Sequence, residues 1–144
     1  MRARSVVLVD TGPLVALFDP SDRSHAACEA ELGRLGRCRL VTSLSVLTEA
    51  TFLLDFSTQA QRAVMEFLAA GAVELAEFAP ADVARAAALM GKYRDLPMDF
   101  ADATLVVLAE RFDTPWVFTL DRRDFTTYRA GRKSFRLLPA AAPP

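Results

Sequence analysis

The chain has 144 residues and a formal net charge of −1, and 52% of its residues are hydrophobic. This composition excludes a disordered chain, and the near-zero charge excludes nucleic-acid binding through overall positive charge alone. The longest stretch without a charged residue, 40–48, is far shorter than the ~18 apolar residues that a membrane helix needs. We expect a single domain over residues 1–138 and a flexible tail over 139–144 (PAAAPP).

The first half of the chain alternates short apolar runs with helical segments. Residues 5–9 (SVVLV) are continuously apolar and rich in β-branched residues, which predicts a strand buried on both faces. The next residues favour a helix that Thr11 caps, that Pro13 helps to start and that continues to Phe18. The elements expected after it are a helix at 22–35, a strand at 39–42, and helices at 43–56 and 60–70.

The second half continues the same alternation. We expect a strand at 72–75, helices at 80–93 and 97–112, and strands at 116–119 and 135–138. Short apolar strands that alternate with helices are typical of βαβ units and a parallel sheet. The predicted fold class is therefore α/β.

Four carboxylates stand where such a sheet binds ligands or where their neighbours are apolar. Asp10 directly follows the first strand and Asp121 follows the strand at 116–119, so both are expected at the carboxyl edge of the sheet. Glu49 and Asp102 lie on helices among apolar residues, where a carboxylate is costly unless it is paired or metal-bound. Each acid alone has an ordinary interpretation as a helix cap, a turn former or a solvated side chain. Their shared placement nevertheless indicates one cluster.

A cluster of carboxylates would repel itself unless a cation lay within it. Mg²⁺ prefers oxygen ligands and Mn²⁺ accepts the same set, so either ion fits. Our hypothesis is that Asp10 and Asp102 hold the main ion, with Asp121 and Glu49 acting through water or on a second ion. Two further acids stay open, as ligands or as supporting groups: Asp99, three residues before Asp102, and Asp124, three after Asp121.

The histidine and the cysteines limit the other metal sites. His25 is the sole histidine, which excludes a zinc site of several histidines and a two-histidine nuclease mechanism. Cys28 and Cys38 match no metal-ligand spacing and are interpreted as free, reduced thiols of a cytoplasmic protein.

Four segments carry a family resemblance. They are VLVDTGPLVALF at 7–18, SLSVLTEATFLL at 43–54, YRDLPMDFADATLVVLAE at 93–110 and FTLDRRDF at 118–125. In this order and spacing they make the chain similar to the PIN-domain ribonucleases, and among these to the VapC-type toxins of bacterial toxin–antitoxin pairs.

The resemblance implies a fold, a chemistry and partners. The four acids that match the family's acids are Asp10, Glu49, Asp102 and Asp121. The implied fold is a three-layer α/β/α sandwich with a central, mostly parallel sheet of four or five strands. The implied activity is magnesium-dependent RNA hydrolysis, together with dimerisation and inhibition by a small antitoxin.

Three other functions remain as alternatives. One is a PIN nuclease that processes RNA outside toxin–antitoxin systems, and another is an inactive PIN-fold module that only binds a partner or RNA. The third is a phosphatase-like or 5′-nuclease-like enzyme acting on DNA, whose larger clamp elements fit poorly in 144 residues.

Two surface features bear on the partners. A basic segment beside Asp121 either holds the RNA backbone or is an ordinary solvated loop. Its members are Arg122, Arg123, Arg129, Arg132, Lys133 and Arg136. Apolar positions on the helices at 44–56 and 60–70 belong to the core, to a dimer face or to a groove for an antitoxin helix.

Overall fold

A parallel sheet lies at the centre of the fold, which the computed structural model describes for residues 5–140. Its strands are, in spatial order, β3 (Glu74–Leu75), β2 (Arg39–Thr42), β1 (Val6–Val9), β4 (Trp116–Phe118) and β7 (Arg136–Leu138). Every neighbouring pair in this sheet is parallel. The five predicted strands are confirmed, and all of them belong to one sheet.

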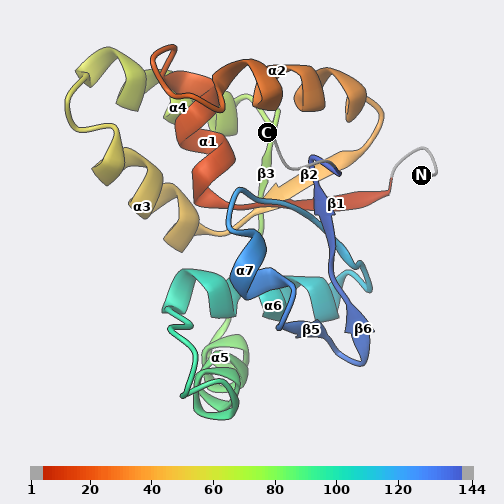
Figure 1. The fold of residues 1–144 in the computed structure, drawn as a ribbon. Coiled ribbons are helices and arrows are strands. Elements are labelled where there is room, and N and C mark those ends of the chain that lie inside the picture. The colour runs from red at the N-terminus through yellow and green to blue at the C-terminus, as the bar shows by residue number, and fades with distance from the viewer. Residues whose placement is uncertain (1–4, 141–144) are drawn as a thin grey trace.

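Helices cover both faces of the sheet (Figure 1). One layer contains α1 (Thr11–Phe18), α2 (His25–Arg34), α3 (Leu44–Leu53) and α4 (Thr58–Ala69). The opposite layer contains α5 (Pro80–Lys92), α6 (Phe100–Arg111) and the short α7 (Arg122–Phe125). The predicted three-layer α/β/α sandwich is confirmed.

The order of the strands places a switch point beside β1. The chain winds from β1 through β2 to β3, and then returns to pair β4 with the other side of β1. At that side, the backbone N–H of Asp10 donates to the carbonyl of Phe118 at 2.9 Å. Ligands of open α/β sheets bind outside the carboxyl ends of strands at such a point. The ends of β1 and β4 therefore mark where a site is expected.

Two helices beside this point begin differently from the prediction. Asp10, and not Thr11, is the N-cap of α1, because its carboxylate accepts the backbone N–H of Thr11 while the Thr11 hydroxyl turns to another acid. Helix α6 begins at Phe100 and not near Pro97, because Asp99 caps it by accepting the backbone N–H of Asp102. Both predicted starts were wrong because a neighbouring carboxylate supplies the cap.

Helix α2 also begins three residues later than predicted, at His25 instead of Asp22. The Asp22 side chain accepts the backbone N–H of Ser24 at 2.8 Å, and Asp19 accepts that of Ser21 at 3.0 Å. These local bonds offer the backbone an alternative to the helix. The segment between α1 and α2 is therefore a pair of turns.

Helix α6 forms the centre of its layer. Every residue from Ala101 to Ala109 is buried. A helix buried on all sides carries its polar residues into the interior, and Asp102 and Thr104 are the polar ones here. The fold thus places one carboxylate directly beneath the end of the sheet.

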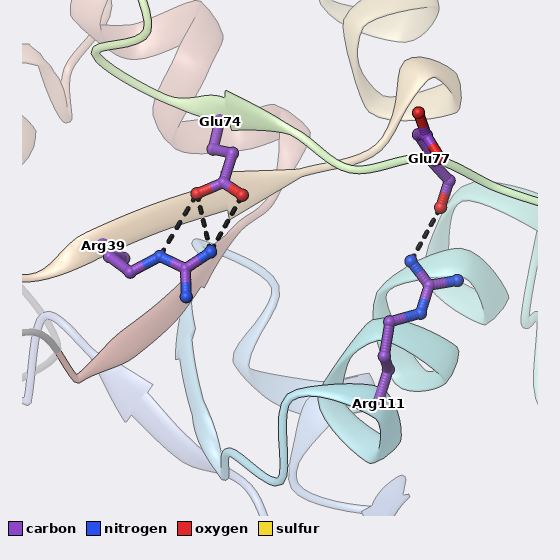
Figure 2. A network of polar contacts seen from close by, with 4 residues as sticks. All are labelled: Arg39, Glu74, Glu77 and Arg111. Atoms are coloured by element: carbon purple, nitrogen blue, oxygen red, sulfur yellow. Dashed lines mark hydrogen bonds and ion pairs between the residues drawn. The ribbon is translucent and has the colours of Figure 1, made fainter.

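Two arginines form hydrogen bonds between neighbouring segments near β3 (Figure 2): Arg39 links β2 to β3, and Arg111 links α6 to the segment after β3. Nη2 of Arg39 on β2 lies 2.9 Å from both carboxylate oxygens of Glu74 on β3. Arg111 at the end of α6 donates to the backbone carbonyl of Glu77 at 2.7 Å. Each pair is exposed, so its contribution to stability is expected to be below ~1 kcal/mol.

The last third of the chain contains elements that were not predicted. They are α7 and an antiparallel hairpin of β5 (Arg129–Ala130) and β6 (Lys133–Ser134), in which Gly131 has a φ of 63°. At the C-terminal end, the Pro139 carbonyl accepts a hydrogen bond from Arg122 at 2.8 Å. Of the predicted tail, residues 141–144 lie outside the described part, and the domain boundary at residue 138 stays a prediction. Across residues 5–140, no helix has the length and hydropathy to cross a bilayer.

Candidate active site

Asp10 is the best-anchored acid of the cluster. It lies at the end of β1 and is 7% exposed. Its Oδ1 accepts the backbone N–H of Thr11 at 2.8 Å, and its Oδ2 accepts the hydroxyl of Thr119 at 2.7 Å. The same Thr119 oxygen accepts the backbone N–H of Asp121 at 2.9 Å. Thr119 therefore joins the acid after β1 to the acid after β4.

Glu49 reaches the cluster from α3. Ser43 caps this helix, and its hydroxyl lies 2.7 Å from that of Thr104 on α6. Glu49 lies further along α3, and its Oε2 accepts the Thr11 hydroxyl at 2.9 Å. Partial burial and the Asp99 charge raise the pKa of Glu49 above its usual range, against the lowering effect of Thr11.

Asp102 accepts a hydrogen bond from the buried phenol of Tyr128. It is 9% exposed, and its Oδ2 accepts the hydroxyl of Tyr128 at 3.2 Å. Burial, and then the charges of Asp99 and Asp10, raise the pKa of Asp102 to about 8. Burial and the nearby acids also push the pKa of Tyr128 far above its usual value, so this phenol remains a donor.

The pKa of Asp10 is raised less than that of Asp102. Burial lifts it to about 6, and the charges of Asp121 and Glu49 add to that rise. Its hydrogen bonds from Thr119 and Thr11 favour the charged form and oppose the rise. Asp10 is therefore the buried acid that ionises more readily.

Asp121 and Asp124 complete the cluster from α7. Asp121 caps this helix by accepting the backbone N–H of Asp124 at 3.3 Å. Partial burial and the charge of Asp121 raise the pKa of Asp124, and Asp99 contributes to that rise. These electrostatic effects link all six acids, since each raises the pKa of another acid or has its own pKa raised by one, although no three of them within residues 5–140 are grouped closely enough to hold an ion by themselves.

A family model described as the PIN domain matches residues 7–131 of this chain. The chain belongs to the PIN-domain family. Ribonuclease VapC26 of Mycobacterium tuberculosis is 38% identical to it over 136 residues, which make up 92% of this chain and 100% of that protein. The predicted membership of the PIN-domain family, with a VapC-type relative, is confirmed.

Solved structures share the fold of this PIN domain at low identity. The M. tuberculosis toxin VapC20, which cleaves the sarcin–ricin loop, has a TM-score of 0.74 and 20% identity over 83% of this chain and 92% of its own. VapBC2 of Rickettsia felis, bound to a promoter DNA fragment, has a TM-score of 0.68 and 13% identity over 92% and 98%. A toxin–antitoxin complex of Klebsiella pneumoniae has a TM-score of 0.65 and 21% identity over 95% and 99%.

Basic residues compensate little of the charge of the cluster in this PIN domain: the charge of Arg123 lowers the pKa of Asp124, against larger effects that raise it. Within residues 5–140, no lysine or arginine forms an ion pair with any of the six acids. Over the same residues, no three His, Cys, Asp or Glu side chains are grouped closely enough to hold an ion by themselves. Mg²⁺ needs no such group, because it keeps several waters and is usually held by one or two carboxylates and a substrate phosphate. The oxygen donors therefore fit a hard divalent cation, and VapC nucleases of this family are metal-dependent in general.

The predicted basic segment is largely engaged in the fold of the PIN domain. Arg129 donates to three backbone carbonyls at residues 126–128, and Lys133 pairs with Asp113 at 2.7 Å. Arg136 stacks over the ring of Trp116 at 5.3 Å. Arg123 and Arg132 are exposed, and their side chains make no hydrogen bond or ion pair to the described residues. The two interpretations of this segment, as a holder of the RNA backbone or as an ordinary solvated loop, both stay predictions, and the first now rests mainly on these two side chains.

The remaining predicted groups lie away from the cluster. Nδ1 of His25 is 2.6 Å from the carbonyl of Ala16, and its Nε2 is 3.2 Å from Glu29, so His25 joins α2 to α1. Neither Cys28 nor Cys38 forms a disulfide, as predicted. Tyr128, by contrast, contacts the cluster and was not predicted. Nothing local marks it, because it meets Asp102 across 26 residues of chain.

Proposed function

We propose that this PIN domain is a metal-dependent endoribonuclease that hydrolyses RNA phosphodiester bonds as the toxin of a toxin–antitoxin pair. One observation carries the proposal. Six carboxylates act on one another near the switch point, no lysine or arginine of the described residues forms an ion pair with them, and burial raises the pKa values of Asp10 and Asp102. A cluster of this kind is costly for the fold and useful for binding a cation. The ribonuclease name of the 38% identical relative supports RNA as the substrate.

We assign the acids as follows. Asp10 and Asp102 hold Mg²⁺ or Mn²⁺ directly, while Glu49 and Asp121 reach it through water or hold a second ion. A divalent ion bound there supplies Lewis-acid chemistry, lowering the pKa of an attacking water and balancing charge on the leaving oxygen. Thr11 and Thr119 keep the Asp10 carboxylate oriented.

Asp99 and Asp124 receive supporting roles in this proposal. The charge of Asp99 acts on Glu49, and that of Asp121 acts on Asp124, whose backbone N–H donates to Asp121 at 3.3 Å. Neighbouring carboxylates disfavour each other's charged forms unless a cation lies near them. We therefore assign each of them to hold its partner acid.

The first test is RNA cleavage with and without the ion. We expect wild-type protein to cut defined RNA oligonucleotides in Mg²⁺ or Mn²⁺ and to lose cleavage in EDTA. Because Asp10→Asn removes a charged ligand but keeps its shape, we expect that variant to cut about a thousandfold more slowly. Gel analysis of end-labelled RNA measures both effects.

The same experiment separates the alternative functions. Undiminished cleavage in EDTA, or by Asp10→Asn, would contradict the metal mechanism. A chain that neither binds Mn²⁺ nor cuts RNA would instead be an inactive binding module. Preference for DNA over RNA would favour the DNA-nuclease alternative.

An exposed apolar face supports the proposed antitoxin partner. We call it the α3–α4 face, and it consists of the exposed apolar side chains of these two packed helices and of the turn between them: Leu44, Phe52, Leu53, Phe56 and Met65, which are 47–72% exposed. Apolar side chains of this size are usually covered when they gather on one surface. The toxin–antitoxin complexes among the structural neighbours favour an antitoxin as the covering partner.

A charge on this face should weaken inhibition. Phe52 is 72% exposed, so Phe52→Asp is expected to fold normally and to bind the antitoxin at least about tenfold more weakly. The measurement is calorimetric binding of a small DNA-binding protein encoded beside the chain, with Val83→Asp on α5 as a matched exposed control. Equal binding by Phe52→Asp and wild type would place the contact elsewhere. If no such protein inhibits cleavage, an RNA-processing role is favoured.

A homodimer and a cytoplasmic location also stay predictions. Sedimentation of the purified chain measures the first, and fractionation of cells that express it measures the second.

A further inference from the structure

We infer that Tyr128 is a positioning residue that holds the Asp102 carboxylate for metal binding. The inference rests on the proposed function and adds to it a residue outside the acid cluster. Tyr128 lies four residues beyond Asp124 and donates its phenol hydrogen to Oδ2 of Asp102 at 3.2 Å. It thereby connects the segment after α7 to α6, the helix that carries Asp102.

The Tyr128 side chain is fixed on every side. It is the largest fully buried side chain of the described residues, with 0% exposure. Its ring packs edge-to-face against Tyr93 at 5.1 Å and against Phe125 at 5.3 Å. Its backbone N–H donates to the Asp124 carbonyl at 3.1 Å. A donor held in this way presents its hydroxyl at one place only.

The hydrogen bond assigns different roles to the two oxygens of Asp102. Oδ2 faces the buried phenol, whereas Oδ1 accepts no hydrogen bond. Among the described residues, no buried side-chain oxygen lacks a partner, so Oδ1 is accessible to solvent. Tyr128 therefore occupies Oδ2 and leaves Oδ1 without a hydrogen bond from the described residues, while the charges of Asp99 and Asp10 act on this carboxylate.

A second buried phenol in the same aromatic cluster provides a control. The hydroxyl of Tyr93 accepts the backbone N–H of Arg129 at 3.1 Å. Its hydrogen bond thus serves the backbone of β5 and contacts no acid of the cluster. Tyr93→Phe and Tyr128→Phe each remove one buried hydroxyl and keep the ring, so they differ in what that hydroxyl holds.

The test is binding of Mn²⁺ alone, measured by electron paramagnetic resonance on the metal-free chain. Partners that orient a metal ligand typically matter by ~10-fold or more in metal affinity. We expect Tyr128→Phe to bind Mn²⁺ about tenfold more weakly and to need about tenfold more Mn²⁺ for half-maximal RNA cleavage. Tyr93→Phe should bind Mn²⁺ like the wild type, even where the two variants melt at similar temperatures.

The outcomes separate this inference from the proposed function. Wild-type affinity in Tyr128→Phe, with Mn²⁺ binding lost in Asp102→Asn, would overturn the inference and leave the metal site intact. Equal weakening by Tyr93→Phe would also overturn it, because the effect would then follow from packing. If the wild-type chain itself binds no Mn²⁺, the proposed function fails and the inference fails with it.

Discussion

Asp102→Asn is expected to lower the rate of RNA cleavage by about a thousandfold while making the metal-free protein more stable near pH 8. A thousandfold loss corresponds to about 4 kcal/mol of transition-state stabilisation, which is reasonable for a direct ligand of the ion. The amide keeps the shape of the carboxyl group and can still accept the hydrogen bond of Tyr128. It removes the charge that burial and the neighbouring acids disfavour.

The gain in stability has the same origin as the loss of activity. A carboxylate whose pKa is raised to about 8 by burial and by Asp99 and Asp10 costs free energy whenever it is charged. We expect relief of roughly 1–2 kcal/mol, which would raise the midpoint of thermal unfolding by several degrees in EDTA. Circular dichroism melts and the cleavage assay measure the two effects on one preparation.

A matched acid outside the cluster provides the control. Asp95 is exposed in the turn before α6, so Asp95→Asn should change neither cleavage nor stability. Wild-type cleavage by Asp102→Asn would contradict its assignment as a ligand. A large loss of stability in that variant would show that the carboxylate supports the fold and does not strain it.

The sequence was sufficient to predict the acids that directly follow strands. Asp10 and Asp121 follow β1 and β4, and parallel strands bring their carboxyl ends to one edge. Glu49 was identified by its apolar neighbours, which mark a helix side that faces other elements. These predictions needed only local pattern and the general geometry of α/β sheets.

The features that were missed depend on which groups meet in space. Tyr128 stands in a segment without helical or strand periodicity, and its role appears only when the segment after α7 packs against α6. The two interpretations of the basic segment stayed open for the same reason, because sequence shows a charge but not its partner. Arg136, for example, stacks on Trp116, twenty residues away. The helix start at Asp22 was misplaced because a side chain–backbone bond competes with the first helical turn there. The start near Pro97 was misplaced because Asp99 caps the helix and sets its first residue at Phe100.

The second large effect is a dependence of stability on pH that reverses the usual behaviour of acids. The pKa values of Asp10 and Asp102 are about 6 and about 8 in the folded chain, against an ordinary value of 3.8. Between the ordinary pKa of 3.8 and the raised pKa of about 8, the folded state binds more protons than the unfolded state. The free energy of unfolding therefore falls as pH rises through this range. The stabilisation is fully present below about pH 4 and is lost by about pH 8. The raised pKa values of Glu49 and Asp124 act in the same direction, whereas the lowered pKa of Asp82 acts in the opposite direction.

We therefore expect the metal-free chain to lose roughly 2 kcal/mol of stability between about pH 5 and about pH 8. Mn²⁺ should restore most of this loss at the higher pH and little at the lower, because its ligands must first release their protons. Thermal melts in EDTA and in Mn²⁺ across this range measure both slopes, and Asp102→Asn should flatten the slope in EDTA. Stability that rises with pH in EDTA would mean that the acids are already balanced within the fold. Stability that falls with pH in EDTA but not in Mn²⁺ would show that the bound ion supplies the positive charge that balances the acids.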